Sequence, residues 1–415
     1  MKIAILGPIA TADISPYLCE LPPPDFPHGT SGAPFMGTLI GTLLGRGYEV
    51  CAITNGGWAT QQSRPVSLKG ARFEFHCVPI RRHSVRPSYG RIGRILDLYA
   101  YERHLIGELL ADIRPDFVHA HWTYEFGMAA IDSGLPYLIT AHDDPVAVLK
   151  LFRNGYRFGR YLMARSVLKR ATALSAVSEY LQGRLTNIAD VPIGVIPNPL
   201  GHRFLDAKVQ RPLPSACIEH RYVSVVNGWG HMKNIDSALR AFSCVRKQRH
   251  DVTYHLFGSD FQSGGPAQRW AETKGVAEGV VFHGRVTHGQ LIDELKAATV
   301  MLHPSRMESC PMGIAEAMAL GLPVVGGCDS GGVAWMIGNG GVTVDINRPE
   351  QIAAAALRLI SDDALYQQCS KAAIYRVQQF SPDMVVNQYE TLYHKILDSR
   401  AEVSFSEDTA RSFGA

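Results

Sequence analysis

The sequence predicts an α/β protein built from two Rossmann-like domains, each with a doubly wound parallel sheet. The first half of the chain alternates short apolar runs with helical patterns, and the second half repeats this scheme. With 415 residues, the chain is long enough for two domains with separate cores. Because such sheets bind ligands at the carboxyl ends of their strands, we expect the two domains to face each other across a substrate cleft.

Short apolar runs bounded by turn residues mark the expected strands. In the first half they are Lys2–Leu6, Tyr48–Thr54, Phe117–Ala120, Tyr137–Thr140, Ala173–Ala176 and Gly194–Ile196. In the second half they are Tyr222–Val226, Thr253–Phe257, Val280–His283, Thr299–Leu302 and Pro323–Val325. Two prolines between the sets, Pro197 and Pro199, favour a hinge. We therefore expect an N-terminal domain of residues 1–200 and a C-terminal domain of residues 201–380.

Composition favours a soluble globular protein, since 46% of the residues are hydrophobic and 19% are charged. No apolar run approaches the roughly 20 residues of a membrane-spanning helix. The apolar start, Met1–Leu6, is cut short by Gly7 and Pro8 and fits a buried strand better than a signal peptide, so we expect a cytoplasmic protein. The 8 cysteines include no CxxC pair, which favours reduced thiols over a metal or disulfide framework.

Two segments of the first half, Arg81–Arg94 and Lys150–Arg170, are rich in arginine and contain no acidic residue. In the second segment, aromatic side chains are interleaved with the basic ones. Such a segment could lie on the anionic inner face of the cell membrane or meet an anionic acceptor. A solvated helix face explains the same pattern equally well, so both interpretations stay open.

The segment Ser305–Gly327 predicts a short helix with two glutamates around its start. Pro311 suits the first helical position, and Gly321 stands where a left-handed C-cap is needed. Glu308 then lies in the loop before the helix and Glu316 lies about a turn and a half inside it, so the two side chains can reach different parts of one extended ligand. That ligand would be anionic, because unpaired N–H groups at a helix start favour phosphate.

This order of residues, a glutamate and then a second glutamate followed by Ala-Met-Ala-x-Gly-x-Pro-Val-Val, resembles the donor-binding motif of the retaining GT-B-fold glycosyltransferases of family 4, the glycosyl transferases group 1. The resemblance implies that Glu308 contacts the transferred sugar as a catalytic residue and that Glu316 binds the ribose hydroxyls of the nucleotide. The backbone amides of Met312, Gly313 and Ile314 are further candidates for binding the donor.

The resemblance extends to the end of the chain. Residues 381–398 resemble the family's final helix, which crosses back onto the first domain. The composition then turns polar, and we expect residues 399–415 to form a flexible tail.

Two glycine-containing loops are candidates for the donor diphosphate. A Gly-rich turn, His28–Pro34, precedes a helix, and in the family a similar loop faces both donor and acceptor, which makes Gly32 a donor-binding candidate. In the second domain, Gly228 lies in the loop that follows the first strand. Many relatives place an arginine directly after this glycine and a lysine a few residues later. Here Trp229 takes the place of the arginine, so Lys233 remains to neutralise the leaving diphosphate as a catalytic group.

Three histidines lie near the ends of two expected strands, namely His119, His121 and His142. The Thr-x-His-Asp sequence around His142 looks like the family segment whose histidine contacts the donor sugar, so His142 is a catalytic candidate. His121 is assigned to the acceptor side, and His119 is expected in the core. His119 and His121 could bind zinc, but no cysteine or glutamate nearby completes a tetrahedral site, so we expect no metal.

The resemblance implies a retaining, metal-independent glycosyltransferase of the hexosyl type that needs no cofactor. It would transfer sugar from a nucleotide-sugar donor to a saccharide or lipid-linked acceptor in cell-surface polysaccharide or glycolipid synthesis, and would bind no nucleic acid. Two alternatives stay open, because both would keep the fold and the nucleotide pocket. One is a GT-B sugar-nucleotide epimerase, and the other is a non-catalytic sugar-nucleotide-binding protein, which the substitutions at Trp229 and Pro311 suggest.

Overall fold

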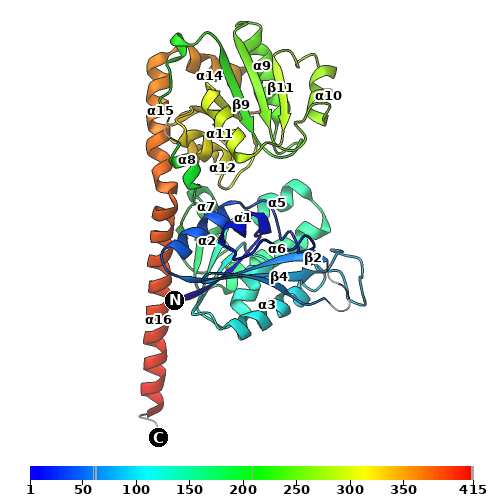
Figure 1. Ribbon diagram of the computed structural model, residues 1–415, viewed down its shortest axis with the longest axis vertical. Coiled ribbons are helices and arrows are strands. Elements are labelled where there is room, and N and C mark those ends of the chain that lie inside the picture. The colour runs from blue at the N-terminus through cyan, green and yellow to red at the C-terminus, as the bar shows by residue number, and fades with distance from the viewer. Residues whose placement is uncertain (59, 61–62, 208, 413–415) are drawn as a thin grey trace. The chain divides into compact units, whose positions relative to one another are not determined.

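The computed structural model describes residues 1–412 apart from residues 59, 61–62 and 208, with side chains described as far as residue 400 (Figure 1). The chain divides into two compact units. The first unit holds Met1–Pro199 together with the chain from Pro382 onward, and the second unit holds Leu200–Ser381.

The first unit is built on an eight-stranded sheet with the order β3-β4-β2-β1-β5-β6-β7-β8. Every neighbouring pair is parallel except β3 and β4, which are antiparallel. The strands are β1 (Lys2–Leu6), β2 (Glu49–Trp58), β3 (Val66–Gly70), β4 (Phe73–Ile80), β5 (Phe117–His121), β6 (Tyr137–Ala141), β7 (Leu174–Ala176) and β8 (Ile193–Val195). The helices are α1 (Thr11–Ile14), α2 (Phe35–Gly45), α3 (Ala100–Ile113), α4 (Glu125–Asp132), α5 (Pro145–Phe152), α6 (Gly155–Arg170), α7 (Glu179–Leu185) and α16 (Pro382–Ser412).

All six strands that the sequence predicted in this half are present, which confirms the parallel sheet. The central strands β1, β5 and β6 are mainly apolar and almost entirely buried, as expected for parallel strands whose two faces are covered by helices. The edge strand β3 and its neighbour β4 were not predicted. The sequence of β3, VSLKG, and the first half of β4, FEFH, alternate between apolar and polar residues, which gives a weaker signal than a continuous apolar run.

The second unit has a six-stranded sheet, entirely parallel, with the order β11-β10-β9-β12-β13-β14. Its strands are β9 (His220–Val225), β10 (Val252–Phe257), β11 (Val280–Gly284), β12 (Val300–His303), β13 (Val324–Gly327) and β14 (Gly341–Val344). Its helices are α8 (His202–Leu205), α9 (Ile235–Arg246), α10 (Pro266–Thr273), α11 (His288–Ala297), α12 (Met312–Ala319), α13 (Val333–Ile337), α14 (Pro349–Ser361) and α15 (Asp363–Val377).

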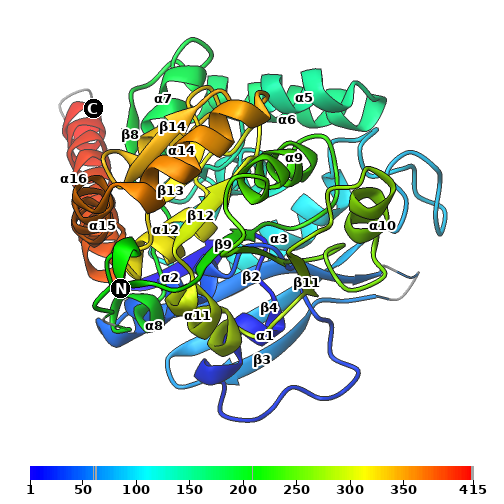
Figure 2. The ribbon, with the colours of Figure 1, turned by 90° about the horizontal axis from the view of Figure 1, so that it is seen from above.

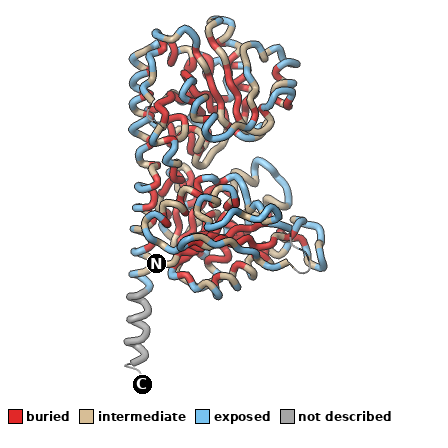
Figure 3. The backbone as a smooth tube through the Cα atoms, viewed as in Figure 1, coloured by how far each residue is buried: buried red, intermediate tan, exposed pale blue. Residues whose placement is uncertain are grey.

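Helices cover both faces of this second sheet. Consecutive residues of a strand therefore lie in two separate hydrophobic cores, one on each face. Tyr222 packs with Phe242 of α9 and Ala356 of α14 on one face. Its neighbour Val223 packs with Ile314 of α12 and other residues on the opposite face. Because side chains alternate along a strand, this arrangement is the doubly wound architecture that the sequence predicted. The buried residues drawn in red follow the strands inside each unit (Figure 3).

Helix α16 belongs to the first unit, where it packs against α2 and β6. Arg46, at the end of α2, donates hydrogen bonds to Asn387 and Glu390 of α16. The helix runs through Ser412, past residue 398, where the sequence was expected to turn into a tail. The reason is local, since no proline or glycine interrupts the chain between Pro382 and Gly414. The last three residues of the expected tail, 413–415, lie outside the described residues.

Among the described residues, no helix is both long enough and apolar enough to cross a bilayer.

Candidate functional site

Helix α12 has the boundaries that its sequence encodes. Pro311 is the N-cap, one residue earlier than predicted, and the helix starts at Met312. At the other end Gly321 takes the left-handed conformation, with a φ of 68°. The amide of Gly321 donates to the carbonyl of Met318 at 2.9 Å, and the amide of Leu322 donates to Ala317 at 3.1 Å. This pair of bonds is a Schellman motif, which fixes the position and the length of the helix.

Glu308 lies in the loop between β12 and α12, and its backbone is held on both sides. Its amide donates to Ser330 at 3.2 Å, and its carbonyl accepts from Gly332 at 2.7 Å. Its side chain forms an ion pair with Lys233, with 2.7 Å between Nζ and Oε1. The ring nitrogen Nε2 of His303, the last residue of β12, lies 3.8 Å from the same oxygen.

These neighbours keep Glu308 ionised. Burial alone would raise the pKa of this carboxyl, but the adjacent His303 imidazole and the Lys233 ammonium more than offset it and lower the pKa to about 2. At neutral pH the site therefore holds a carboxylate and an ammonium side by side. His303 was not predicted, because a histidine at the end of an apolar strand is equally compatible with a core residue.

Lys233 is positioned by a loop that follows β9. Gly228 in this loop has a φ of 93°, a conformation that favours glycine. The loop ends at Asn234, which is also left-handed, with a φ of 53°. The buried amide group of Asn234 donates to the carbonyls of Pro304 at 3.1 Å and Ile346 at 2.9 Å. Asn234 thus holds the Lys233 loop against the segment that leads to Glu308. This role of Asn234 was not predicted from the sequence.

The start of α12 offers fewer free amides than predicted. The amide of Ile314 donates to the carbonyl of Pro311 at 3.0 Å, so it is not available for a ligand in this conformation. The amides of Met312 and Gly313 have no acceptor among the described residues. Gly313 also lies against β9, where an added Cβ would come within 3.1 Å of the carbonyl oxygen of Val225. Two amides, rather than three, are therefore free to bind an anion near Glu308.

Glu316 lies further along α12 and has a different environment from Glu308. Burial raises the pKa of Glu316 to about 7, an effect that Arg203 only partly counteracts. No donor among the described residues forms a hydrogen bond with its carboxylate. A carboxyl group in this state can accept hydrogen bonds from a ligand hydroxyl without first breaking a bond within the protein.

Two further residues of the loops around Lys233 and Glu308 have structural roles. Trp229 packs against Trp270, with 5.4 Å between the ring centroids, and its amide donates to Asp260 at 2.9 Å. The guanidinium of Arg306 donates to Asn347 at 2.8 Å and to the carbonyl of His231. Trp229 therefore fills the place of the expected arginine with apolar contact, and Arg306 holds the loop together.

In the first unit, His142 directly follows β6 and lies in a stack of aromatic rings. Its ring lies 4.1 Å from that of Trp122 and 5.2 Å from that of Phe35, with interplanar angles of 21° in both cases. Its Nε2 lies 3.0 Å from Nδ1 of His121. Burial lowers the pKa of His142 well below its usual range and lowers that of His121 to about 3, so both rings are neutral at physiological pH.

His119 is fully buried and bonded on both sides of its ring. Its Nδ1 lies 2.7 Å from the hydroxyl of Tyr393 on α16, and its Nε2 lies 2.8 Å from the hydroxyl of Thr140. These contacts confirm the interpretation of His119 as a core residue. In contrast, Nε2 of His121 is buried and has no hydrogen-bond partner within the described part of the chain.

Gly32 lies in the exposed loop before α2 and has a φ of 110°, which favours glycine. It comes three residues before Phe35, whose ring stacks on His142. The structure thus brings the glycine loop and the histidine pair to the same part of the first unit. It likewise brings Glu308, Lys233 and the start of α12 together in the second unit.

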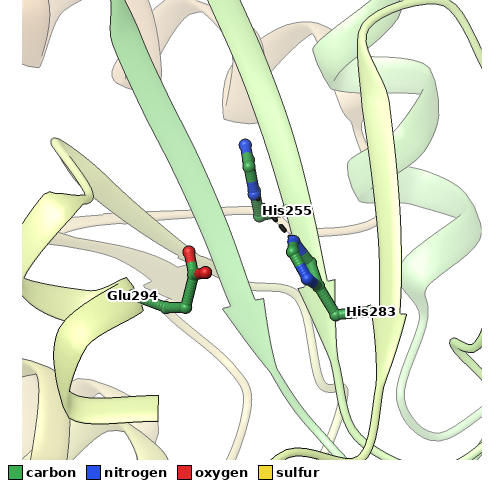
Figure 4. A group of neighbouring side chains, drawn as sticks. All are labelled: His255, His283 and Glu294. Carbon is green, nitrogen blue, oxygen red and sulfur yellow. Dashed lines mark hydrogen bonds between the residues drawn. The ribbon is translucent and has the colours of Figure 1, made fainter. Parts of the chain in front are cut away.

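One group of side chains has the composition of a metal site. His255 on β10, His283 on β11 and Glu294 on α11 place their ligand atoms within 4.8 Å of one another (Figure 4). However, Nδ1 of His255 lies at hydrogen-bond distance, 2.9 Å, from Nε2 of His283, and Arg221 forms an ion pair with Glu294 at 2.7 Å. These polar groups are therefore satisfied by one another, and a cation would have to compete with Arg221 for the carboxylate.

Comparison with known proteins agrees with this arrangement. The family model described as glycosyl transferase 4-like domain matches residues 32–199, and the one described as glycosyl transferases group 1 matches residues 219–376. The N-acetyl-alpha-D-glucosaminyl L-malate synthase of Bacillus anthracis is 23% identical over 398 residues, which cover 88% of this chain and 94% of that protein. The TuaC protein of Bacillus subtilis, named for teichuronic acid biosynthesis, is 25% identical over 301 residues, 64% of this chain and 72% of its own length.

Solved structures show the same fold. Sucrose-phosphate synthase from Thermosynechococcus elongatus superposes with a TM-score of 0.72 at 19% identity, covering 96% of this chain and 99% of that one. The alpha,alpha-trehalose 6-phosphate synthase from Burkholderia multivorans gives a TM-score of 0.69 at 12% identity, covering 97% and 98%. With a mainly parallel sheet in each unit and a family model matching each half, the chain belongs to glycosyltransferase family 4 and is a glycosyltransferase with the GT-B fold.

Proposed function

We propose that the protein transfers a hexosyl group from a nucleotide-sugar to a saccharide or lipid-linked acceptor, with retention of configuration at the anomeric carbon. We place the reaction in cell-surface polysaccharide or glycolipid synthesis, at the cytoplasmic side of the membrane. The relative named for teichuronic acid biosynthesis supports this placement, and the malate synthase, whose name describes a glucosaminyl product, supports sugar transfer.

The observation that carries the proposal is the ion pair between Lys233 and Glu308 beside the free amides of Met312 and Gly313. Breaking a sugar–phosphate bond leaves negative charge on the departing nucleoside diphosphate. Preorganised cations and N–H groups aimed at that charge lower the barrier. Lys233 and the two amides supply such groups, so no metal ion or other cofactor is part of the proposal.

The electrostatics of Glu308 support its assignment to the transferred sugar rather than to proton transfer. A carboxylate whose pKa is about 2 is a poor general base at neutral pH. Its 2.7 Å contact with Lys233 also occupies one oxygen. Glu308 is therefore suited to accept hydrogen bonds from sugar hydroxyls, and the leaving phosphate would take the proton of the acceptor on the same face of the sugar.

The remaining predicted residues complete the proposed site. Glu316 would accept hydrogen bonds from the ribose hydroxyls of the nucleotide, and Gly228 would let the backbone approach the diphosphate. In the first unit, Gly32 and the neutral ring of His142 would contact the donor, and His121 would lie on the acceptor side. The free, buried Nε2 of His121 is consistent with a polar group of a ligand serving as its partner.

The test has two stages. A thermal-shift screen with UDP-, GDP- and ADP-sugars identifies the donor, because a ligand that binds the folded state raises the unfolding midpoint. Transfer is then measured with that donor and a panel of saccharide and lipid-linked acceptors, and the anomeric configuration of the product is read by NMR. The expected result is an acceptor-dependent product with the configuration of the donor. Inversion would rule out the retaining mechanism.

A second candidate function is binding of a sugar-nucleotide without transfer, and Trp229 is the observation that favours it. An apolar side chain packed on Trp270 stands where many relatives carry a catalytic arginine. Donor binding without transfer to any acceptor would support this alternative. A new sugar-nucleotide formed from the donor alone would instead indicate an epimerase.

A further inference from the structure

We propose that the first unit carries a docking surface for the anionic face of a lipid bilayer. The surface is made by the loop 82–96 and by the hairpin of α5 and α6, residues 150–165, and we call it the basic apolar patch. The inference does not depend on the proposed transfer reaction, because vesicle binding is measured without donor or acceptor.

Helix α6 has apolar side chains on two opposite faces. One face buries Met163 and Val167 in the interior of the first unit. The other exposes Phe158 and Leu162, which are four residues apart and therefore lie on the same side of the helix, with Arg165 one turn further along. Phe158 is 52% exposed and Leu162 is 41% exposed. A helix whose second face is also apolar indicates that this face has a partner.

The turn between α5 and α6 presents more apolar and basic groups. Leu151 and Phe152 are exposed at the end of α5, and Lys150 and Arg153 flank them. The guanidinium of Arg157 lies 4.7 Å from the ring centroid of Phe152. The two helices are in contact with each other, so the turn is held as one hairpin (Figures 1 and 2). Large apolar rings and cations together at the tip of a hairpin suit the headgroup region of a bilayer.

The loop 82–96 has the same composition and a defined fold. Its tip is a tight turn at Tyr89 and Gly90, closed by reciprocal backbone bonds between Ser88 and Arg91. The exposed apolar side chains of this loop are Val85, Tyr89, Ile92 and Leu96, all more than half exposed. A buried arginine, Arg81, holds the base of the loop through Asp97 at 2.8 Å and Glu102 at 2.7 Å. The ion pairs of Arg81 therefore fix the base of the loop, and its four apolar side chains remain exposed to solvent.

The fold brings the loop and the hairpin together, although some 60 residues separate them in the sequence. The hydroxyls of Tyr99 and Tyr156 lie 3.1 Å apart. An added Cβ on Gly159 would come within 2.3 Å of the side chain of Ile95, so the loop packs directly on α6 at a position where only glycine leaves room. The two basic segments of the sequence therefore pack against each other in the folded first unit.

The charge on this surface is not neutralised by the protein itself. Among the described residues, Arg82, Arg86, Arg153, Arg157 and Arg165 form no ion pair with a carboxylate. The loop contains no acidic residue before Asp97. The hairpin contains none either, since the chain has no acidic residue between Asp144 and Glu179. Positive charge alone would fit any polyanion, but eight exposed large apolar side chains among the cations favour a bilayer, which can accept both.

Not every basic residue of these segments belongs to the patch. Arg160 is ion-paired with Glu125 and its guanidinium lies 3.6 Å from the ring centroid of Tyr124, so it is part of the interior. Lys169 pairs with Asp190, and Arg170 pairs with Asp132. Replacing Arg160 would disturb the fold rather than the surface, so the test uses Arg153 and Arg165.

The experiment sediments the full chain with vesicles of phosphatidylcholine alone and with vesicles of equal parts phosphatidylcholine and phosphatidylglycerol. We expect binding to the mixed vesicles that weakens as salt is added. Arg153→Glu combined with Arg165→Glu should weaken binding on the order of 25-fold or more, about fivefold for each basic residue lost. Phe158→Ser combined with Leu162→Ser should weaken it about tenfold, because apolar area no longer enters the bilayer.

A matched control distinguishes the effect of the patch from the effect of net charge on vesicle binding. Lys247→Glu combined with Lys274→Glu makes the same change in charge at exposed positions of the second unit and should bind as the wild type does. Circular dichroism checks the fold of each variant. Three outcomes would overturn the proposal: no binding of the wild type to mixed vesicles, an equal loss in the control, or wild-type binding by the apolar variant. The last would point to a soluble polyanion instead.

Discussion

The ammonium of Lys233 lies 2.7 Å from the carboxylate of Glu308, although the first follows β9 and the second follows β12. The two strands are neighbours in the parallel sheet, so the loops at their carboxyl ends meet at one edge. Both side chains are about one-fifth exposed, so the pair is accessible to a ligand. In the free protein the two charges neutralise each other. An incoming diphosphate can attract the ammonium of Lys233, and both side chains stay in contact with solvent.

Lys233→Ala should lower turnover by about 100-fold while changing donor affinity much less, because a cation aimed at a leaving group acts mainly in the transition state. The measurement is kcat for transfer together with the donor Kd from thermal shift. Lys233→Arg should keep part of the rate, since it keeps the charge. Lys247→Ala, at an exposed position on the same unit, is the matched control and should leave both quantities unchanged. An unaltered kcat in Lys233→Ala would show that the leaving group is neutralised elsewhere.

Glu308→Gln should impair transfer strongly while leaving the protein folded. The substitution keeps the shape of the side chain but removes the charge that Lys233 and His303 stabilise. Because the folded-state pKa of about 2 lies below the ordinary value of 4.5, the ionised group stabilises the protein above pH 4.5, and this is lost as the pH falls toward 2. The stability of the variant should therefore decrease less steeply than that of the wild type as the pH falls from 4.5 to 2. Wild-type transfer rates in Glu308→Gln would contradict the assigned role.

The elements that carry this site could be predicted because local rules define them. The strands β9 and β12 each contain a short, mainly apolar run, and the Schellman motif at Gly321 depends on a single glycine in the correct place. The two glutamates were recognised because their order before Ala-Met-Ala-x-Gly-x-Pro-Val-Val resembles the donor-binding motif of the family. Local signals of this kind do not require knowledge of what packs against them.

Contacts between distant segments could not be predicted in this way. His303 approaches Glu308 only because β12 ends beside the loop, and Asn234 reaches Pro304 and Ile346 only in the folded sheet. The 3.0 Å bond that occupies the amide of Ile314 depends on the exact entry angle of the chain at Pro311. Sequence spacing fixes which residues occur in a segment, whereas these partners depend on tertiary geometry.

The raised pKa of Glu316 predicts that nucleotide affinity depends on pH. Its carboxylate form is the better acceptor for ribose hydroxyls, so affinity should rise about tenfold between pH 6 and pH 8 as a group with a pKa of about 7 ionises. The stability of the free protein should fall as the pH rises from 4.5 to 7, because the folded-state pKa of about 7 lies above the ordinary 4.5. Calorimetric titration of the nucleotide at several pH values measures the first effect, and thermal unfolding without ligand measures the second.

Glu316→Gln is the control for this titration, since the amide keeps its size and cannot ionise. Its nucleotide affinity should be weaker than that of the wild type at pH 8 and flat across the range. A pH dependence that persisted in this variant would have to come from another group, and the assignment of the ribose contact would be abandoned. Glu316→Ala should weaken binding further, because no acceptor is left.

The hydroxyl of Tyr393 lies 2.7 Å from Nδ1 of His119, in a place where neither side chain is exposed. This contact ties α16 to β5, and the ring of His119 in turn lies 4.1 Å from that of His121. Tyr393→Phe removes the hydroxyl and leaves a buried nitrogen without its partner, which should cost about 1–3 kcal/mol of stability. Tyr375→Phe, at a position that is 84% exposed, should change stability by less than about 0.5 kcal/mol. Urea unfolding followed by circular dichroism compares the two, and equal midpoints would mean that the His119 contact does not hold the helix in place.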